Sequence, residues 1–121
     1  MIILADDDPD QRLALRLALE LAGYWVREAA DGEEALKLQR ERLAPVLITD
    51  IFMPNTDGLE VVQIFKREFP ATKIIVISGG GQRVTLDYLA SVELMGVHAT
   101  LQKPFKVEAL LKLLQDLIPQ R

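Results

Sequence analysis

Five polar side chains stand directly after predicted strands, although they are spread over nearly the whole chain. Asp6 and Asp7 follow the first apolar run, Asp50 the third, Ser78 the fourth and Lys103 the fifth. The carboxyl ends of parallel strands meet at one edge of a sheet, and ligands bind outside that edge. We therefore expect three carboxylates, a hydroxyl and an ammonium group to converge there.

The charges of these groups indicate their chemistry. Carboxylates held close together repel each other, and a divalent cation that favours oxygen ligands, such as Mg²⁺, Mn²⁺ or Ca²⁺, relieves the repulsion. With a cation and the Lys103 ammonium flanking Asp50, the site suits phosphoryl transfer, which depends on positioning and charge stabilisation. A carboxylate that attacks phosphorus forms an acyl phosphate, and Ser78 would donate a hydrogen bond to a phosphoryl oxygen.

Apolar runs alternate with amphipathic segments along the chain. Short continuous apolar runs are typical of strands buried on both faces, and apolar residues at i, i+3, i+4 and i+7 are typical of helices. We predict strands at 2–5, 46–49, 74–77 and 98–102, and a further strand that begins with residues 24–26. We predict helices at 9–22, 32–43, 59–69, 84–95 and 107–118. Asp8 is the expected N-cap of the first helix, whose apolar residues include Leu13, Leu17 and Leu21.

Five strands that alternate with five helices predict the α/β fold class. Right-handed crossovers between such strands require a mainly parallel sheet with helices on both faces, a three-layer doubly wound arrangement. At 121 residues the chain has the size of one domain. We therefore assign residues 1–121 to a single domain.

Composition excludes several kinds of site and partner. The chain has no cysteine, so it has no disulfide, thiolate metal site or cysteine nucleophile. Its formal net charge of −4 leaves no basic surplus, and we expect no direct nucleic-acid binding. We see neither a secretory signal nor a membrane-spanning run and expect a cytoplasmic protein. His98 is the single histidine, and without partner residues we expect it to be solvated.

Four segments, in order, resemble the receiver domain of bacterial two-component response regulators of the chemotaxis type. They are ILADDDP at 3–9, ITDIFMP at 48–54 with DG at 57–58, IVISG at 75–79, and LQKPF at 101–105. The resemblance extends over essentially the whole chain. It implies a flavodoxin-like five-stranded sheet of order 2-1-3-4-5.

The resemblance also implies a role for each acidic residue of the site. Asp50 would accept a phosphoryl group from the phosphohistidine of a histidine kinase or of a histidine phosphotransfer protein in a phosphorelay. Mg²⁺ would be the cofactor, bound by Asp6, Asp7, Asp50 and the backbone carbonyl of Phe52.

Two further residues of the site, and two departures from the family pattern, follow from the same resemblance. Ser78 would move toward the phosphoryl group, and Lys103 would pair with it. Thr100 stands where the family commonly has a tyrosine or phenylalanine that rotates inward, so an aromatic ring cannot report phosphorylation here. The glycine run at 79–81 is also unusual and favours a looser loop.

We therefore predict a phosphorylation-controlled signalling switch that acts through contacts with a downstream protein. It would dephosphorylate itself slowly and would not be a turnover enzyme. We expect a stand-alone regulator, and a fragment of a longer regulator also fits. Ala109 and Leu113 lie off the core stripe of the last helix, so the face formed by the fourth helix, fifth strand and last helix is a candidate dimer or partner surface.

Two alternatives differ in class from this switch. A haloacid-dehalogenase-like phosphatase uses an aspartate-x-aspartate after its first strand, which Asp6 and Asp8 provide. Asp10 stands where that class usually has threonine or valine, and no acidic pair follows later. The second alternative is a receiver-like module that is not phosphorylated and acts only by docking.

Overall fold

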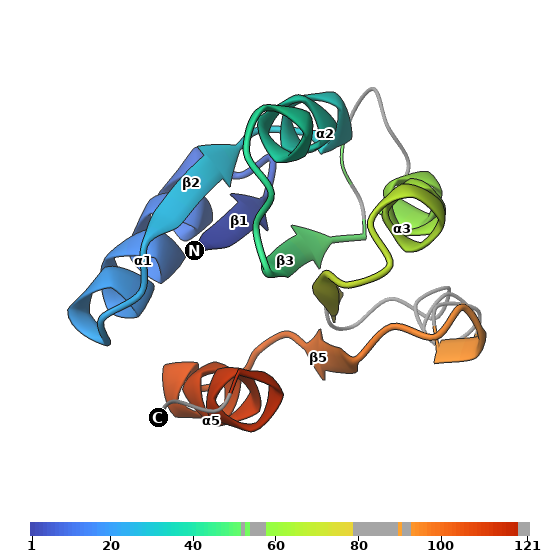
Figure 1. The fold of residues 1–121 in the computed structure, drawn as a ribbon. Coiled ribbons are helices and arrows are strands. Elements are labelled where there is room, and N and C mark those ends of the chain that lie inside the picture. The colour runs from blue at the N-terminus through green and yellow to red at the C-terminus, as the bar shows by residue number, and fades with distance from the viewer. Residues whose placement is uncertain (52, 54–57, 79–89, 91–92, 119–121) are drawn as a thin grey trace.

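The computed structural model describes residues 1–51, 53, 58–78, 90 and 93–118. A five-stranded sheet lies between two layers of helices (Figure 1). The strands are β1 (Ile2–Ala5), β2 (Val26–Ala29), β3 (Val46–Asp50), β4 (Lys73–Ser78) and β5 (Ala99–Gln102). The helices are α1 (Pro9–Leu21), α2 (Gly32–Glu41), α3 (Gly58–Glu68) and α5 (Val107–Leu117).

The sheet is parallel throughout, and its strand order is β2-β1-β3-β4-β5. This confirms the predicted α/β fold class and the order 2-1-3-4-5. β1 and β3 are completely buried, whereas the edge strands β2 and β5 are partly exposed. Burial on both faces explains why the central strands are continuous apolar runs, while Arg27 and Glu28 are tolerated in β2.

Each face of the sheet has its own hydrophobic core. α2 and α3 cover one face, where Phe65 is fully buried. α1 and α5 cover the other face, where Leu19 and Leu114 are fully buried. Successive residues of β1 alternate between the two cores, with Ile3 in the first and Ile2 in the second. The two cores hold the strand ends, and the polar residues on them, in fixed register.

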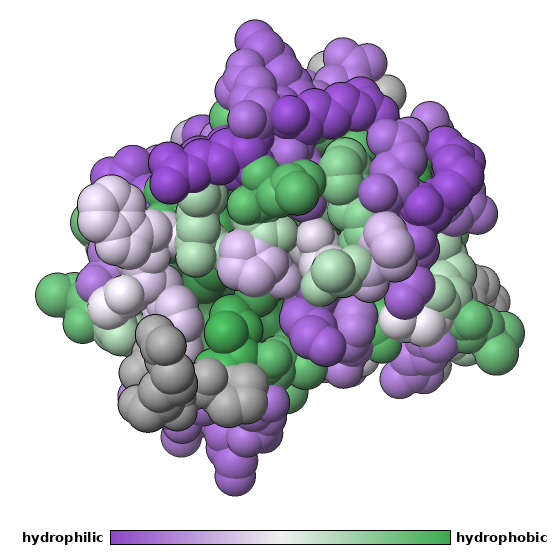
Figure 2. Space-filling view, in the orientation of Figure 1, coloured by the Kyte–Doolittle hydropathy of each residue, from purple (hydrophilic) through white to green (hydrophobic). Residues whose placement is uncertain are grey.

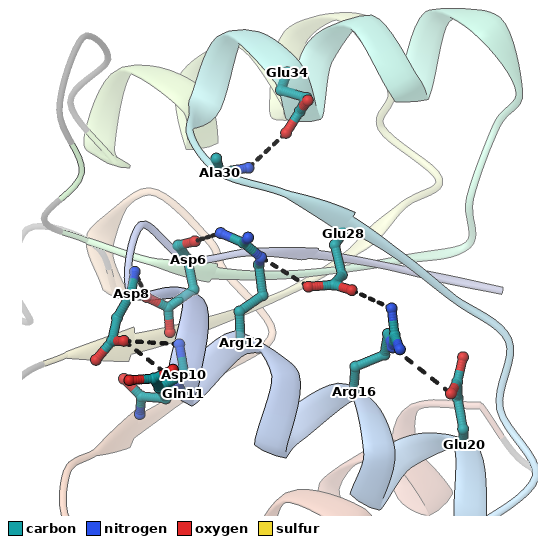
Figure 3. A network of polar contacts seen from close by, with 10 residues as sticks. All are labelled: Asp6, Asp8, Asp10, Gln11, Arg12, Arg16, Glu20, Glu28, Ala30 and Glu34. Atoms are coloured by element: carbon teal, nitrogen blue, oxygen red, sulfur yellow. Dashed lines mark hydrogen bonds and ion pairs between the residues drawn. The ribbon is translucent and has the colours of Figure 1, made fainter.

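Aspartate side chains begin the first two helices. Asp8 accepts hydrogen bonds from the backbone N–H groups of Asp10 and Gln11, which confirms it as the N-cap of α1 (Figure 3). Asp31 caps α2 by accepting from the backbone of Glu34, and Glu34 accepts in turn from the backbone of Ala30. These bonds satisfy N–H groups at the helix starts that have no partner within a helix.

The buried side of α1 differs from the apolar residues singled out in the sequence. Leu15 and Leu19 are the buried leucines, whereas Leu13, Leu17 and Leu21 are 44%, 48% and 91% exposed. Leucines occur on both sides of this helix, so apolar spacing alone does not identify the side that meets the sheet.

β2 begins at Val26, two residues later than predicted. Gly23 has a positive φ of 98°, which ends α1 in a turn that glycine adopts easily. Trp25 lies before the strand and is 81% exposed, although its carbonyl accepts a 2.7 Å hydrogen bond from the backbone of Ile2. The aromatic pair at 24–25 therefore marks the approach to the strand and not its first residues.

Buried hydrogen bonds around Gln39 close the end of the sheet where the strands begin, which we call the amino pole. Gln39 is fully buried; its Oε1 accepts from the Ala44 backbone at 2.9 Å and its Nε2 donates to Thr72 Oγ1 at 3.0 Å. Thr72 Oγ1 donates to the Ala44 carbonyl at 3.0 Å. This network fastens the segment before β3 to the segment before β4.

His98, also at the amino pole, has a partner that the sequence did not indicate. Its Nδ1 accepts a 3.0 Å hydrogen bond from the backbone N–H of Ile74, and its own backbone N–H donates to the Ile74 carbonyl at 2.9 Å. Burial, then Lys73 and Lys66, lower the pKa of His98. His98 is exposed, as expected for a solvated histidine, but the expectation that it lacks a partner was wrong; its Nδ1 must be unprotonated to accept this bond.

α3 begins at an unusually close approach of two backbone segments. The Gly58 N–H donates to the Ile51 carbonyl at 2.9 Å, and a Cβ on Gly58 would lie 2.3 Å from that oxygen. Only glycine fits at this position. The contact ties the start of α3 to the residue that follows Asp50.

The helix predicted over 84–95 lies mostly outside the described residues, within which Ala90, Glu93 and Leu94 are helical. The glycine run at 79–81 also lies outside them.

Figure 2 shows hydrophilic residues gathered along the upper edge of the molecule, where Figure 1 places α2. Among the described helices, none is long and apolar enough to cross a membrane.

Candidate functional site

Three carboxylates meet at the end of the sheet where the strands finish, which we call the carboxyl pole. One oxygen from each of Asp6, Asp7 and Asp50 can be chosen so that all three lie within 4.8 Å of one another. Asp6 and Asp50 are buried, at 2% and 7% exposure, and Asp7 is exposed. Asp50 is the last residue of β3, and Asp6 follows the neighbouring strand β1. The register of these two strands therefore brings together residues that are far apart in the sequence.

Backbone and side-chain contacts hold Asp6 in place. Its N–H donates to the Ala29 carbonyl of β2 at 3.0 Å, and its Oδ1 accepts from the Asp8 backbone at 2.9 Å. Arg12 of α1 donates to the Asp6 carbonyl at 2.7 Å (Figure 3). Three separate anchors thus fix a buried carboxylate beside two others.

The electrostatic environment opposes the negative charge of Asp6. Burial raises the pKa of Asp6, and the Asp50 and Asp7 carboxylates raise it further. The hydrogen bond from Asp8 and the positive charge of Lys103 act in the opposite direction and lower the pKa, but the net shift is upward. Bringing these carboxylates together therefore has an electrostatic cost, which a bound cation would remove.

Lys103 supplies the positive charge that faces Asp50. Its Nζ lies 3.0 Å from Asp50 Oδ2 and 2.7 Å from Gln11 Oε1. Its backbone N–H donates to the Ser78 carbonyl at 2.9 Å, so the residue is anchored to the end of β4, and its peptide bond to Pro104 is cis. The predicted approach of Lys103 to Asp50 is confirmed.

Ser78 lies at the end of β4 with its side chain completely buried. Its Oγ has no hydrogen-bond partner among the described residues. The backbone N–H of Ile51 donates to Ile77, the residue before Ser78, at 3.1 Å, so β3 and β4 end side by side. A buried hydroxyl without a partner is costly, and such groups occur where a ligand or a reaction uses them.

The donor set suits a divalent cation that prefers oxygen. Mg²⁺ binds oxygen at roughly 2.0–2.1 Å, so oxygens on opposite sides of one ion are about 4 Å apart, a separation compatible with the 4.8 Å limit of the cluster. Asp6, Asp7 and Asp50 would supply the protein ligands, and two of them are buried away from competing solvent. The carbonyl of Phe52, expected from the sequence as a further ligand, lies outside the described residues.

Several other residues named in the sequence analysis take ordinary structural places. Asp8 directs its carboxylate to the start of α1, so its described contacts are those of a helix cap. Thr100 is half-buried in β5 opposite Val76. Ala109 is exposed on α5, and Leu113 packs partly against the second core.

Gln11, Arg12 and Glu28 contribute to this pole but were not identified as functional from the sequence. Gln11 contacts Lys103, and Arg12 links the Asp6 carbonyl to Glu28 through a 2.8 Å ion pair. Arg16 forms a second ion pair with Glu28 (Figure 3). The hydrogen bond from Arg12 is the largest of the effects that lower the pKa of Glu28. Gln11 and Arg12 are in the first turns of a helix and Glu28 is in an edge strand, where polar residues are common, and nothing in their spacing showed that they contribute to the site.

Known proteins match this chain over nearly its full length. The family model described as the response regulator receiver domain matches residues 2–115. The C4-dicarboxylate transport transcriptional regulatory protein DctD of Pseudomonas aeruginosa is 35% identical over 112 residues, which cover 91% of this chain and 23% of that protein. A putative response regulator NtrX-like of Rickettsia bellii is 29% identical, over 94% of this chain and 24% of that protein. The chain thus spans about a quarter of these relatives.

Solved structures agree with the sequence matches. The receiver domain of NtrX from Brucella abortus superposes with a TM-score of 0.91 at 25% identity, covering 100% of both chains. The Vibrio cholerae chemotaxis protein CheY4 superposes with a TM-score of 0.82 at 31% identity, covering 97% of both chains. Sequence, strand order and solved relatives all point to one group, and the chain belongs to the response regulator receiver domain family of two-component signalling.

Proposed function

We propose that this receiver domain is a switch controlled by phosphorylation of Asp50. The observation that supports the proposal is that the Asp50 carboxylate lies 3.0 Å from the Lys103 ammonium and close to the carboxylates of Asp6 and Asp7. Asp50 thus has one positive charge beside it, on Lys103, and the carboxylate ligands that could hold a second one, a divalent cation. We further propose that residues 1–121 form a single receiver domain.

The reaction follows from these positions. An Asp50 oxygen attacks the phosphorus of a phosphohistidine, forming an O–P bond while the P–N bond breaks. The electron pair stays on the departing imidazole nitrogen, which takes a proton. Lys103 stabilises the negative charge on the transferring group, and the buried Ser78 hydroxyl donates to a phosphoryl oxygen. Because Asp50 is consumed until water removes the phosphoryl group, the domain acts as a switch and not as a turnover enzyme.

Asp6, Asp7 and Asp50 would hold Mg²⁺ in this proposal, with the Phe52 carbonyl as a further ligand. Bound there, the ion supplies positive charge that neutralises the phosphoryl oxygens during transfer. The environment of Asp6 supports a cation site. Without a bound cation, burial and the neighbouring carboxylates raise the pKa of Asp6.

The proposed partners are a histidine kinase or histidine phosphotransfer protein as donor and a downstream protein as target, in the cytoplasm. Phosphorylation replaces a carboxylate by a larger and more negative group, which can reorganise contacts around it. Thr100 occupies the position of the aromatic switch residue, so we propose that the response involves Ser78 and the segment after β4. A dimer through the face that includes Ala109 and Leu113 of α5 is the second output that we propose.

Intact-mass spectrometry after incubation with acetyl phosphate and Mg²⁺ tests the proposal. We expect one added phosphoryl group, which disappears in Asp50→Asn and is suppressed by a chelator. Asp116→Asn is the matched control, because Asp116 is an exposed aspartate of α5. An unchanged mass for the parent protein, in the presence of Mg²⁺ and a working positive-control receiver, would favour the docking module instead.

A further inference from the structure

Lys103 is held by two side chains and not by Asp50 alone. Its Nζ donates to Asp50 Oδ2 at 3.0 Å and to Gln11 Oε1 at 2.7 Å, the shorter of the two contacts. An ammonium group has three N–H donors and no acceptor. Two of the three donors are therefore directed, one toward the reacting carboxylate and one toward an amide on a different element.

The chain fixes both ends of the Gln11–Lys103 contact. Gln11 lies in the first turn of α1, where the Asp8 side chain accepts from its backbone N–H at 3.3 Å. Figure 3 shows Asp8 and Gln11 side by side at this helix start. Lys103 is anchored through its backbone to the Ser78 carbonyl. The contact thus joins the beginning of α1 to the connection between β5 and α5, across 92 positions of sequence.

The chemistry of an amide suits this position. A lysine side chain is long and flexible, so a single partner restricts it poorly. The Gln11 carbonyl oxygen adds a second acceptor without adding negative charge to a site that already holds three carboxylates. A carboxylate at the same place would attract the ammonium away from Asp50 and repel an anionic phosphodonor.

We propose that Gln11 is a positioning residue that holds the Lys103 ammonium against Asp50 for phosphoryl transfer. The inference rests on the proposed function of Lys103. Gln11 itself does not contact the phosphoryl group; it acts by restricting Lys103. Both side chains line a solvent-open groove of about 390 Å³ that also includes Ala14 and Phe105. Water can enter there and replace the amide in part, so the effect of losing Gln11 is moderate.

Two measurements on one set of variants test the proposal. Gln11→Met keeps the length of the side chain and removes the acceptor, Gln11→Glu keeps an acceptor but adds charge, and Gln115→Met makes the matched change at an exposed site on α5. The first measurement is the initial rate of phosphorylation by acetyl phosphate with Mg²⁺. The second is the rate at which an amine-acetylating reagent modifies Lys103, relative to Lys106 and Lys112 in the same molecule.

We expect Gln11→Met to slow phosphorylation about three- to tenfold, the range for a partly exposed hydrogen bond to a charged group. Lys103 acetylation, measured relative to the two reference lysines, should become faster than in the parent, because the released amine is no longer held by the Gln11 oxygen and meets the reagent more often. Gln11→Glu should also slow phosphorylation but should leave Lys103 acetylation at or below the parent rate. Gln115→Met should change neither measurement.

The two readouts separate positioning from a merely structural role. A slower reaction with unchanged Lys103 acetylation in Gln11→Met would overturn the proposal, because Gln11 would then act through another group. Faster acetylation with an unchanged reaction rate would also overturn it, because holding Lys103 would not matter to transfer. Failure of the proposed function shows differently: the parent protein, and not only the variants, would then take up no phosphoryl group.

Discussion

The two poles of the sheet treat buried polar groups in opposite ways. At the amino pole, the fully buried Gln39 bonds to Ala44 and Thr72, and its amide oxygen and nitrogen both have partners. At the carboxyl pole, Asp6 and Asp50 are buried near each other, and Ser78 Oγ has no partner among the described residues. The amino pole uses polarity to fasten segments together. The carboxyl pole keeps polar groups in unfavourable surroundings, where they are available for chemistry.

The largest expected effect is at the amino pole. Gln39→Met keeps the approximate volume but leaves the buried Ala44 N–H without its acceptor and removes the donor to Thr72 Oγ1, so we expect a loss of about 2–4 kcal/mol in the free energy of unfolding. Urea denaturation followed by far-UV circular dichroism measures it. Gln63→Met, on the exposed side of α3, is the control and should change stability little. Similar small losses in both variants would contradict the fastening role of Gln39.

A smaller effect on the free energy of unfolding is expected for Glu28, the carboxylate near the carboxyl pole that is paired with two arginines. Arg12 and Arg16 hold the pKa of Glu28 below its usual range. The ion pairs therefore stabilise the fold above the ordinary glutamate pKa, and this contribution disappears as pH falls through the lowered value. Glu28→Gln should cost about 1 kcal/mol at neutral pH, reduced by partial exposure, and less at pH about 3.

The pH dependence of this loss is its check. Denaturation of parent and variant at neutral and acidic pH gives the difference, with exposed Glu41→Gln as the comparison. A cost for Glu28→Gln that stays the same at both pH values would mean that packing, and not charge, is responsible.

Removing the charge of Asp6, which lies close to two other carboxylates, should change stability in the opposite direction. Because the Asp6 environment disfavours the charged form, Asp6→Asn should stabilise the metal-free protein by up to about 1 kcal/mol. The Asn Oδ1 can still accept from the Asp8 backbone. Thermal unfolding in chelator and then in millimolar Mg²⁺ measures two effects: a higher Tm for the variant without Mg²⁺, and a smaller rise on adding it.

Asp116→Asn is again the control, since it makes the same chemical change far from the cluster. If Asp6→Asn lowered the Tm in chelator, the pole would not be electrostatically strained as described. If Mg²⁺ raised the Tm of parent and variant equally, Asp6 would not be a ligand.

The smallest effect is expected at His98, because this residue is exposed. Its folded pKa is below the unfolded value of about 6.5, so the unfolded chain binds more protons as pH falls between the two. Stability is complete above the unfolded pKa and decreases as pH drops through the folded pKa. His98→Asn should reduce the fall in Tm between pH 7 and pH 5. Equal pH dependence in parent and variant would show that the Nδ1 bond contributes nothing.

The carboxyl-pole half of this contrast was predictable from the sequence, because its residues follow directly after predicted strands. The buried runs before Asp6, Asp50 and Ser78 placed those residues at one pole, and Lys103 followed from its place after the fifth strand. The amino pole was not predicted, since the partners of Gln39 and His98 lie 24 or more positions away or on backbone atoms. Gln11 was missed for the same reason: a first-turn glutamine gives no sign of which side chain it will meet.

The sequence also did not predict which side of α1 is buried. Leucines stand on both sides of this helix, so the sheet and α5 decide which ones are buried. Edge strand β2 began later than predicted because Tyr24 and Trp25 have strand-forming side chains in a segment that only approaches the sheet. In both cases tertiary contacts overruled a local preference.

The exposed position of Trp25 has a consequence for spectroscopy. It is the only tryptophan in the chain, it is 81% exposed, and it lies just before β2 at the amino pole, away from Asp50. Its emission should already resemble that of indole in water, and should change little with Mg²⁺, with beryllofluoride or on denaturation. A fluorescence assay for this receiver domain therefore needs a tryptophan introduced near the carboxyl pole, and Trp25→Phe provides the dark background for it.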